Sequence, residues 1–255
     1  DLHGKQHSFP TRRSSDLEWL LLESGLFKGF LDTGGSVAIH AFGAYFGLGV
    51  VATTDKKFQG KPAPQSTKVS NEFCLLGSMI LWLFWPSFTS AVVSPDHAYL
   101  TVLNTVLALC GSTLATYVFT KLIRGKIDIE DIANAALAGG VCIGSTCSTA
   151  NPGFSMVIGI CAGTLSTLGF SVIAPKVCKL IRGTDTCGVH NLHGMPGLLG
   201  GLFGIAITGN VGVQLGAVIA TVVVGLVLGR VCGAILGLFG TKDDTYQDED
   251  DFILE

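Results

Sequence analysis

Charged residues are scarce in this sequence, and long stretches of it contain none. Asp, Glu, Lys and Arg make up 14% of the 255 residues, whereas about a quarter is usual for soluble domains. They are absent from 33–54, 73–95, 97–120, 132–175 and 186–229. Each stretch is long enough for a helix of about 20 residues to cross the hydrocarbon core of a bilayer. This distribution excludes an ordinary soluble domain and predicts an integral membrane protein.

The uncharged stretches predict an all-α membrane fold with seven transmembrane helices. The two longest stretches each hold two helices, separated at Asn151-Pro152-Gly153 and at Gly209-Asn210, where helix-breaking residues mark turns. The expected helices are 33–53, 72–93, 98–120, 130–149, 153–174, 186–207 and 212–239. The 34 glycines suit close contacts between helices within a bilayer.

The motifs of several enzyme and cofactor classes are also missing. Gly139-Gly140 and Gly144-Ser145 resemble a phosphate-binding loop, but no Gly-Lys-Ser/Thr follows them. No Gly-x-Ser-x-Gly elbow of a hydrolase occurs. The eight cysteines have neither metal-like nor disulfide-like spacing, and the net charge of −3 argues against a nucleic-acid partner. We therefore expect no cofactor, no metal and no enzymatic activity.

The two ends differ in character from the apolar body of the chain. Residues 8–17 look like a translated adaptor or fusion scar, so we expect residues 1–17 to be non-native and disordered, with a natural N-terminal part missing. Residues 18–240 form the expected membrane domain. Residues 241–255 form an acidic tail, in which Phe252-Ile253-Leu254 could dock on a partner.

Basic residues alternate between the loops and thereby predict the orientation. The loops after the second, fourth and sixth expected helices carry no Lys or Arg, whereas those after the first, third and fifth do. The residues concerned are Lys56, Lys57, Lys61, Lys68, Lys121, Arg124, Lys126, Lys176, Lys179 and Arg182. Because cytoplasmic loops carry the excess of Lys and Arg, we expect the first helix to enter from outside, the sixth from inside, and the tail to be cytosolic.

Two segments carry the same motif in these oppositely directed helices. Asp32-Thr33-Gly34-Gly35 leads to His40, and Asp185-Thr186-Cys187-Gly188 leads to His193, with the histidine eight residues after the aspartate in both. Eight residues of helix rise about 12 Å, close to half of a hydrocarbon core of about 30 Å. Both histidines should therefore reach the middle of the membrane from opposite sides, as in an inverted repeat.

A histidine within a membrane helix is costly, which makes His40 and His193 the main candidates for a functional site. Two neutral imidazoles can share one proton while their outward nitrogens face a pore; the alternative is two separate core histidines. His190 lies three residues before His193, on the same helix face. A metal site built from all three histidines is the second alternative, although no further ligand is evident and zinc needs three or four.

Asp32, Asp185 and Phe88 allow two interpretations each. The aspartates could cap the helices that follow them, or their charge could attract a cation and then favour its deprotonation at a pore mouth. Phe88 ends the second expected helix together with Trp82 and Trp85. By position these aromatic residues suit a membrane–water interface, with a pore gate as the alternative.

Four segments resemble the Rh glycoproteins of the ammonium transporter superfamily. The most specific is Asp185-Thr186-Cys187-Gly188-Val189-His190-Asn191-Leu192-His193-Gly194-Met195-Pro196-Gly197, and the others are 39–47, 85–88 and 136–141. The resemblance implies an inverted-repeat ammonia channel of eleven or twelve helices, of which this chain retains about seven. It also implies a homotrimer in the plasma membrane with one pore per subunit.

Matched position by position, the resemblance assigns roles to the candidate residues. His40 and His193 correspond to the pore-lining twin histidines, Asp32 and Asp185 to the paired aspartates, and Phe88 to one phenylalanine of the outer gate. Ammonium would lose its proton, and neutral ammonia would pass the histidines. The alternatives are a carbon dioxide channel, a non-transporting membrane scaffold, and a membrane enzyme with a metal held by the histidines. Membrane lipid and a cytoskeletal partner of the tail complete the expected partners.

Overall fold

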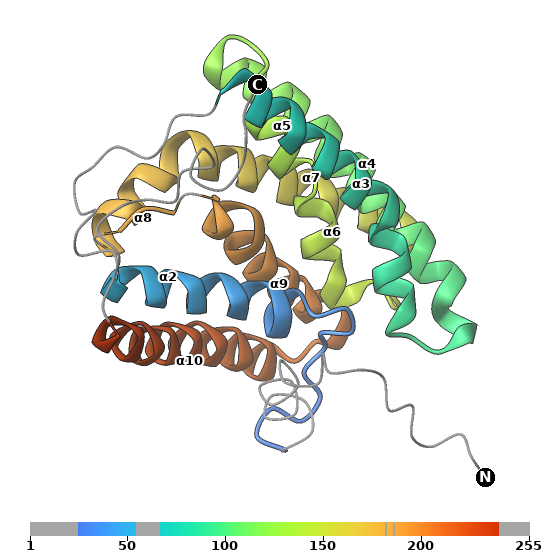
Figure 1. Ribbon diagram of the computed structural model, residues 1–255. Coiled ribbons are helices and arrows are strands. Elements are labelled where there is room, and N and C mark those ends of the chain that lie inside the picture. Colours follow the sequence, from blue (N-terminus) through green and yellow to red (C-terminus); the bar gives the residue numbers. More distant parts are fainter. Residues whose placement is uncertain (1–24, 55–66, 182, 186, 240–255) are drawn as a thin grey trace.

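The computed structural model describes residues 25–54, 67–181, 183–185 and 187–239, and within these ranges the secondary structure is entirely helical (Figure 1). The predicted all-α fold is confirmed. The elements are η3 (Ser36–Ala41), α2 (Phe42–Thr54), α3 (Lys68–Ala91), α4 (Pro95–Arg124), α5 (Ile129–Ala135), α6 (Ala138–Ile143), η5 (Gly144–Thr146), α7 (Pro152–Leu168), η6 (Gly169–Ile173), α8 (Ala174–Ile181), η7 (His190–Gly194), α9 (Met195–Thr208) and α10 (Val211–Leu238). The expected scar, the tail, and Lys56, Lys57, Lys61 and Arg182 lie outside the described residues.

Five of the seven expected membrane helices are long and apolar enough to cross a bilayer. They are Ser36–Thr54, Lys68–Ala91, Pro95–Arg124, Pro152–Ile181 and Val211–Leu238. The other two are built from shorter pieces. The expected helix 130–149 divides into α5, α6 and η5, and the expected helix 186–207 corresponds to η7 followed by α9.

The division of 130–149 follows from its burial inside the protein. Every residue of α6 and η5 is buried, and a Cβ atom at Gly139 would overlap the carbonyl group of Ala108 in α4. Small residues such as Gly139 let the backbones of α6 and α4 approach each other this closely. An apolar run predicts burial, but its composition alone does not distinguish a continuous membrane helix from a segment enclosed by other helices.

Two closely packed parallel helix pairs frame the fold. In the first, Gly159 and Gly163 of α7 face Ala108 and Ser112 of α4. In the second, α2 and α10 run side by side along one edge of the molecule (Figure 1). Glycines of α10 lie against the backbone of α2 at Phe42, Phe46 and Val50, in rising order along both helices. In both pairs a Cβ atom would strike the neighbouring backbone, so glycine is what permits the contact.

Helix α9 runs against the direction of η3 and α2. From the end of η7 through α9, Gly194 lies near Ala44, Gly197 near Ala41 and Gly204 near Leu31, so the contacts descend along the first segment. The two repeated motifs therefore approach the centre of the fold from opposite ends. This is the relation that the loop charges predict for the first and sixth expected helices.

Candidate functional site: the paired histidine segments

The two repeated motifs fold into the same turn. The N–H of Gly35 donates to the carbonyl oxygen of Asp32 at 3.2 Å, and the N–H of Gly188 donates to that of Asp185 at 3.3 Å. Both glycines are in the left-handed region, with φ of 77° and 65°. Because residues other than glycine rarely adopt this conformation, the glycine at the fourth position of each motif is required by the turn.

Each aspartate then caps the helical segment that its own turn begins. The Asp32 carboxylate accepts from the N–H of Val37 at 3.1 Å and of Ala38 at 2.8 Å. The Asp185 carboxylate accepts from the N–H of Val189 at 2.9 Å and of His190 at 3.0 Å. These contacts agree with the capping interpretation of the two aspartates.

Asp32 has an additional contact that Asp185 does not share. Its carboxylate is 2% exposed and accepts a hydrogen bond from the Ser145 hydroxyl at 2.6 Å. Ser145 belongs to the glycine-rich segment that resembles a phosphate loop in sequence. In the structure this segment packs against the first motif, where the N–H of Gly34 donates to the carbonyl of Gly144 at 2.7 Å. The Ser36 hydroxyl donates to the carbonyl of Val141 at 2.6 Å. The segment therefore anchors η3 in the protein interior.

Both histidines lie in short π-helical turns, His40 in η3 and His193 in η7. Single turns of this wide geometry are rare and occur frequently at functional sites. His40 and His193 are partly buried, and their Nδ1 atoms are 3.2 Å apart. Their ring planes differ by 9° with centroids 5.2 Å apart, so the imidazoles meet edge to edge.

The short contact restricts how protons are distributed over the pair. One Nδ1 must carry a hydrogen and the other must accept it, so both rings cannot be protonated while the bond exists. In the neutral pair, the ring that donates through Nδ1 has an acceptor at Nε2, and its partner has a donor there. The pair therefore presents one hydrogen-bond donor and one acceptor at its outer nitrogens.

Two aromatic residues of α3 also contact His40. Phe88 meets it edge-on at 6.3 Å between ring centroids, and Trp85 lies nearly parallel to it, at 5.6 Å and 21°. Trp85 is 8% exposed and belongs to the hydrophobic core, whereas Phe88 is 41% exposed. Trp85 thus faces the protein interior and not a membrane–water interface.

By position, the sequence favours a membrane interface for Trp85 with a pore gate as the alternative, although a signal for an inward position is present. The inward-facing residues Ser78, Trp82, Trp85 and Thr89 of α3 follow the 4-3-4 spacing of one helix face. Phe88 follows Trp85 by three residues and so lies on an adjacent part of that face. The periodicity of α3 therefore predicts that Trp85 faces the protein interior, whereas its position near the helix end does not.

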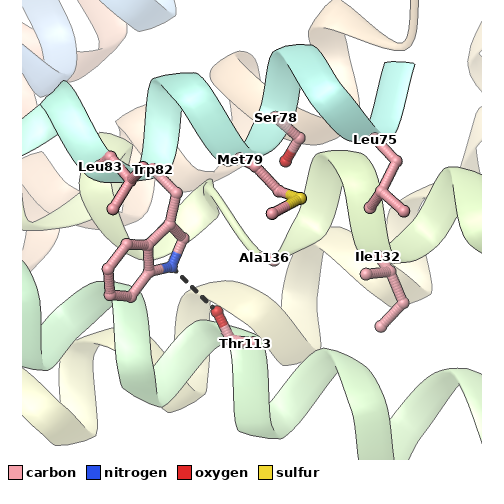
Figure 2. A pocket seen from close by; sticks show the side chains of 8 residues that line it. All are labelled: Leu75, Ser78, Met79, Trp82, Leu83, Thr113, Ile132 and Ala136. Atoms are coloured by element: carbon pink, nitrogen blue, oxygen red, sulfur yellow. Dashed lines mark hydrogen bonds between the residues drawn. The ribbon is translucent and has the colours of Figure 1, made fainter. Parts of the chain in front are cut away.

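Trp82 lies next to a separate apolar pocket of about 300 Å³ between α3, α4 and the segment around α5 (Figure 2). Its Nε1–H donates to the Thr113 hydroxyl at 3.2 Å. The residues lining the pocket are Leu75, Ser78, Met79, Trp82, Leu83, Thr113, Ile132 and Ala136. They include none of the histidine site, so the two neighbouring tryptophans of α3 serve different parts of the molecule.

Two further histidines lie within the described residues, and their contacts differ from those of the pair. His190 meets Tyr45 edge-on, with ring centroids 5.7 Å apart, and His97 is exposed in the first turn of α4. Within the described part of the chain, no group of three or more His, Cys, Asp or Glu side chains is arranged to hold a metal ion.

Comparison with known proteins agrees with this architecture. Residues 16–252 match the model of the Ammonium Transporter Family. The Rh type A ammonium transporter of Canis lupus familiaris is 45% identical over 182 residues, which cover 68% of this chain and 43% of that protein. The Rh type B ammonium transporter of Danio rerio is 42% identical over 193 residues, which cover 73% and 41%. This chain thus spans about two fifths of the length of these curated relatives.

A solved structure extends the similarity to the fold. Rh50 of Nitrosomonas europaea, from the Rhesus protein family of channels, superposes with a TM-score of 0.88 at 48% identity, covering 93% of this chain and 64% of that one. The family match covers the turns, the π-helical segments and the histidine pair described above. The chain therefore belongs to the ammonium transporter family, as an Rh-type member.

Proposed function

We propose that this protein transports ammonium across a membrane by conducting neutral ammonia past His40 and His193. The observation that carries the proposal is the 3.2 Å contact between their Nδ1 atoms, formed by two oppositely directed segments. Family membership supports ammonium as the substrate. The likeness to Rh50, a channel, supports conduction through a pore.

The donor–acceptor pattern of the pair suits ammonia. Ammonia has one lone pair and three N–H groups, so it can accept from the Nε2–H of one ring and donate to the bare Nε2 of the other. Carbon dioxide has no hydrogen to donate and would use only one of the two groups. An ammonium ion cannot accept at all, so only the neutral molecule uses both nitrogens.

Deprotonation before the pair follows from the cost of moving a charge. Transfer of an unpaired ion into apolar surroundings costs many kcal/mol, and the ion instead gives up its proton where that is possible. Phe88 lies near the C-terminal end of α3 and meets the His40 ring edge-on. Because Phe88 is 41% exposed, the proposal places it at the pore entrance that leads to His40. In this proposal ammonium loses its proton near Phe88, and ammonia is reprotonated on the far side.

In the proposal, the main role of the two aspartates is to hold the backbone turns that position the histidines. Asp32 and Asp185 fix the turns that bring each histidine to the same depth, and their carboxylates are occupied by N–H groups of η3 and η7. A negative charge on either side of the histidine pair also favours a cation there.

The proposal includes an orientation and an assembly. Helices α4 and α7 are parallel, so Lys121 and Arg124 at the end of α4 and Lys176 and Lys179 in α8 mark the same face. We assign this face to the cytosol by the positive-inside rule, together with the C-terminus, in a homotrimer of the plasma membrane as the resemblance implies. Protease access to a C-terminal tag in sealed vesicles checks the orientation, and native mass spectrometry checks the trimer.

The decisive experiment measures ammonia permeability in proteoliposomes by stopped-flow internal pH. The double substitution His40→Ala/His193→Ala removes the donor and the acceptor together. Because an unpaired polar group costs about 1–3 kcal/mol, we expect the protein-dependent permeability to fall about tenfold or more.

His97→Ala is the matched control, since it removes an exposed histidine outside the pair. It should retain wild-type permeability. Equal permeability of the double variant and the wild-type protein, at equal amounts in the vesicles, would show that the pair does not carry the substrate.

A further inference from the structure

Trp85 covers one face of His40 at the point where the two halves of the fold meet. The indole and the imidazole are 5.6 Å apart and inclined by 21°, within the range of an offset-stacked aromatic pair. The edge of the same imidazole holds His193 through Nδ1. His40 thus contacts Trp85, a residue that lies outside both of the repeated Asp-to-His motifs.

The orientation of the His40 ring decides whether the Nδ1 contact exists. The terminal torsion of a histidine is broad, so rotation of the His40 ring out of its present plane would carry Nδ1 away from His193. A half-turn keeps that plane but places carbon toward His193, and it is opposed by loss of the Nδ1 hydrogen bond itself. A flat aromatic neighbour favours rotamers in which the imidazole lies parallel to it. The indole of Trp85 therefore restricts His40 to the plane in which it meets His193.

Trp85 is itself rigidly held. It is 8% exposed within the core cluster, and Gly140 of α6 lies directly beside its indole. A Cβ atom at Gly140 would come within 2.7 Å of the indole Cε2 and Nε1 atoms. The glycine thus provides the space that the large ring occupies.

The polar end of Trp85 does not account for its presence. A buried indole N–H usually finds an acceptor, but the Nε1 of Trp85 has no hydrogen-bond partner among the described residues. Trp82, three residues earlier, does donate to Thr113. Burial of the large apolar ring in the core is favourable for either tryptophan, and the contact with His40 is the feature that distinguishes Trp85 from Trp82.

We propose that Trp85 is a positioning residue, which fixes the plane of His40 and thereby keeps the Nδ1 hydrogen bond to His193 formed. The inference rests on the proposed function for its effect on transport, but its structural part stands independently. Trp85 acts through His40 and need not touch the substrate.

The test compares Trp85→Leu with Trp85→Phe and uses Trp82→Leu as the matched control. Leucine removes the aromatic face, phenylalanine keeps it without the N–H, and Trp82→Leu removes an indole from the same helix without touching His40. The first readout is the 15N NMR spectrum of histidine-labelled protein in lipid, in which Nδ1 of His40 and His193 report their shared hydrogen. The second is ammonia permeability in proteoliposomes.

We expect Trp85→Leu to lose the shared-hydrogen signal and to lower permeability about two- to tenfold, the range that corresponds to a lost aromatic contact. Trp85→Phe and Trp82→Leu should keep both readouts near wild type. A retained signal in Trp85→Leu, or an equal loss in Trp82→Leu, would overturn the inference.

Gly140→Ala keeps every aromatic side chain and covers the case in which Trp85→Leu does not fold. Its methyl group displaces the indole, so the signal should weaken relative to Gly77→Ala, where the added methyl meets no atom within 4 Å. An unchanged signal in Gly140→Ala counts against the inference. If wild-type protein fails to conduct ammonia, the proposed function fails, and the NMR readout still decides the role of Trp85.

Discussion

Replacement of Asp32 by alanine should destabilise the protein far more than the same replacement of Asp185. The two residues are equivalent in sequence, and each caps a π-helical turn. Asp32, however, is 2% exposed and takes a third hydrogen bond, from Ser145 at 2.6 Å. Asp185 is partly exposed, and its two capping contacts are to backbone N–H groups of its own segment.

The expected magnitudes follow from the groups that each substitution leaves unpaired. Asp32→Ala strands the N–H groups of Val37 and Ala38 and the Ser145 hydroxyl, all of them buried. At about 1–3 kcal/mol for each stranded group, with partial relaxation, the free energy of unfolding should fall by about 3–5 kcal/mol. Asp185→Ala is the loss of a cap that water can partly replace, worth about 1 kcal/mol.

Reversible unfolding in mixed micelles provides the assay, and a double-mutant cycle sharpens it. The cycle of Asp32→Ala and Ser145→Ala should give a coupling energy of about 1.5–3 kcal/mol, as for a hydrogen bond to a charged group. Asp96→Ala, in the exposed first turn of α4, is the control and should cost about 0.5 kcal/mol. Equal losses at Asp32 and Asp185, or a coupling energy near zero, would refute the reasoning.

Two further predictions concern glycines and use the same unfolding assay. Gly159→Ala should lower the free energy of unfolding by about 2 kcal/mol, because its methyl group overlaps the α4 backbone. Gly153→Ala makes only an ordinary contact at 3.5 Å, so it should be neutral or stabilise by up to about 1 kcal/mol. The same sign at both sites would contradict the packing argument. Gly188→Ala should cost more than the strain of a left-handed alanine, which is about 1–2 kcal/mol, because its methyl group also meets the Phe170 ring. Gly125→Ala, with a φ of 76° and no atom near the added methyl group, should cost only the backbone strain. A smaller loss at Gly188 would show that the Phe170 ring moves aside.

The convergence of His40 and His193 could be predicted because every step depended on local, countable features. The equal spacing of eight residues sets the depth of each histidine, and the loop lysines set the directions of the two segments. Neither step requires knowledge of side-chain packing. The contact at 3.2 Å then needs only that the segments be adjacent, which an inverted repeat supplies.

What could not be predicted depends on packing between distant segments. The expected helix 130–149 is interrupted because its glycines meet Ala108 and Trp85, and no periodicity within the segment records these partners. A tryptophan near a helix end is typical of a membrane interface, so position favours that interpretation of Trp85 over a pore gate. Its contact with His40 joins residues 45 positions apart, so it is a property of the fold.

The two halves of the repeat also differ in a way that the motif hides. The first half is tied into the interior through Asp32, Ser36 and the indole of Trp85. In the second half, Asp185 and His190 are both partly exposed, and the Asp185 carboxylate accepts from the backbone N–H groups of Val189 and His190 in its own segment. Besides His193, two aromatic rings contact His40, those of Trp85 and Phe88. We therefore expect a motion that opens the pair to begin at His193.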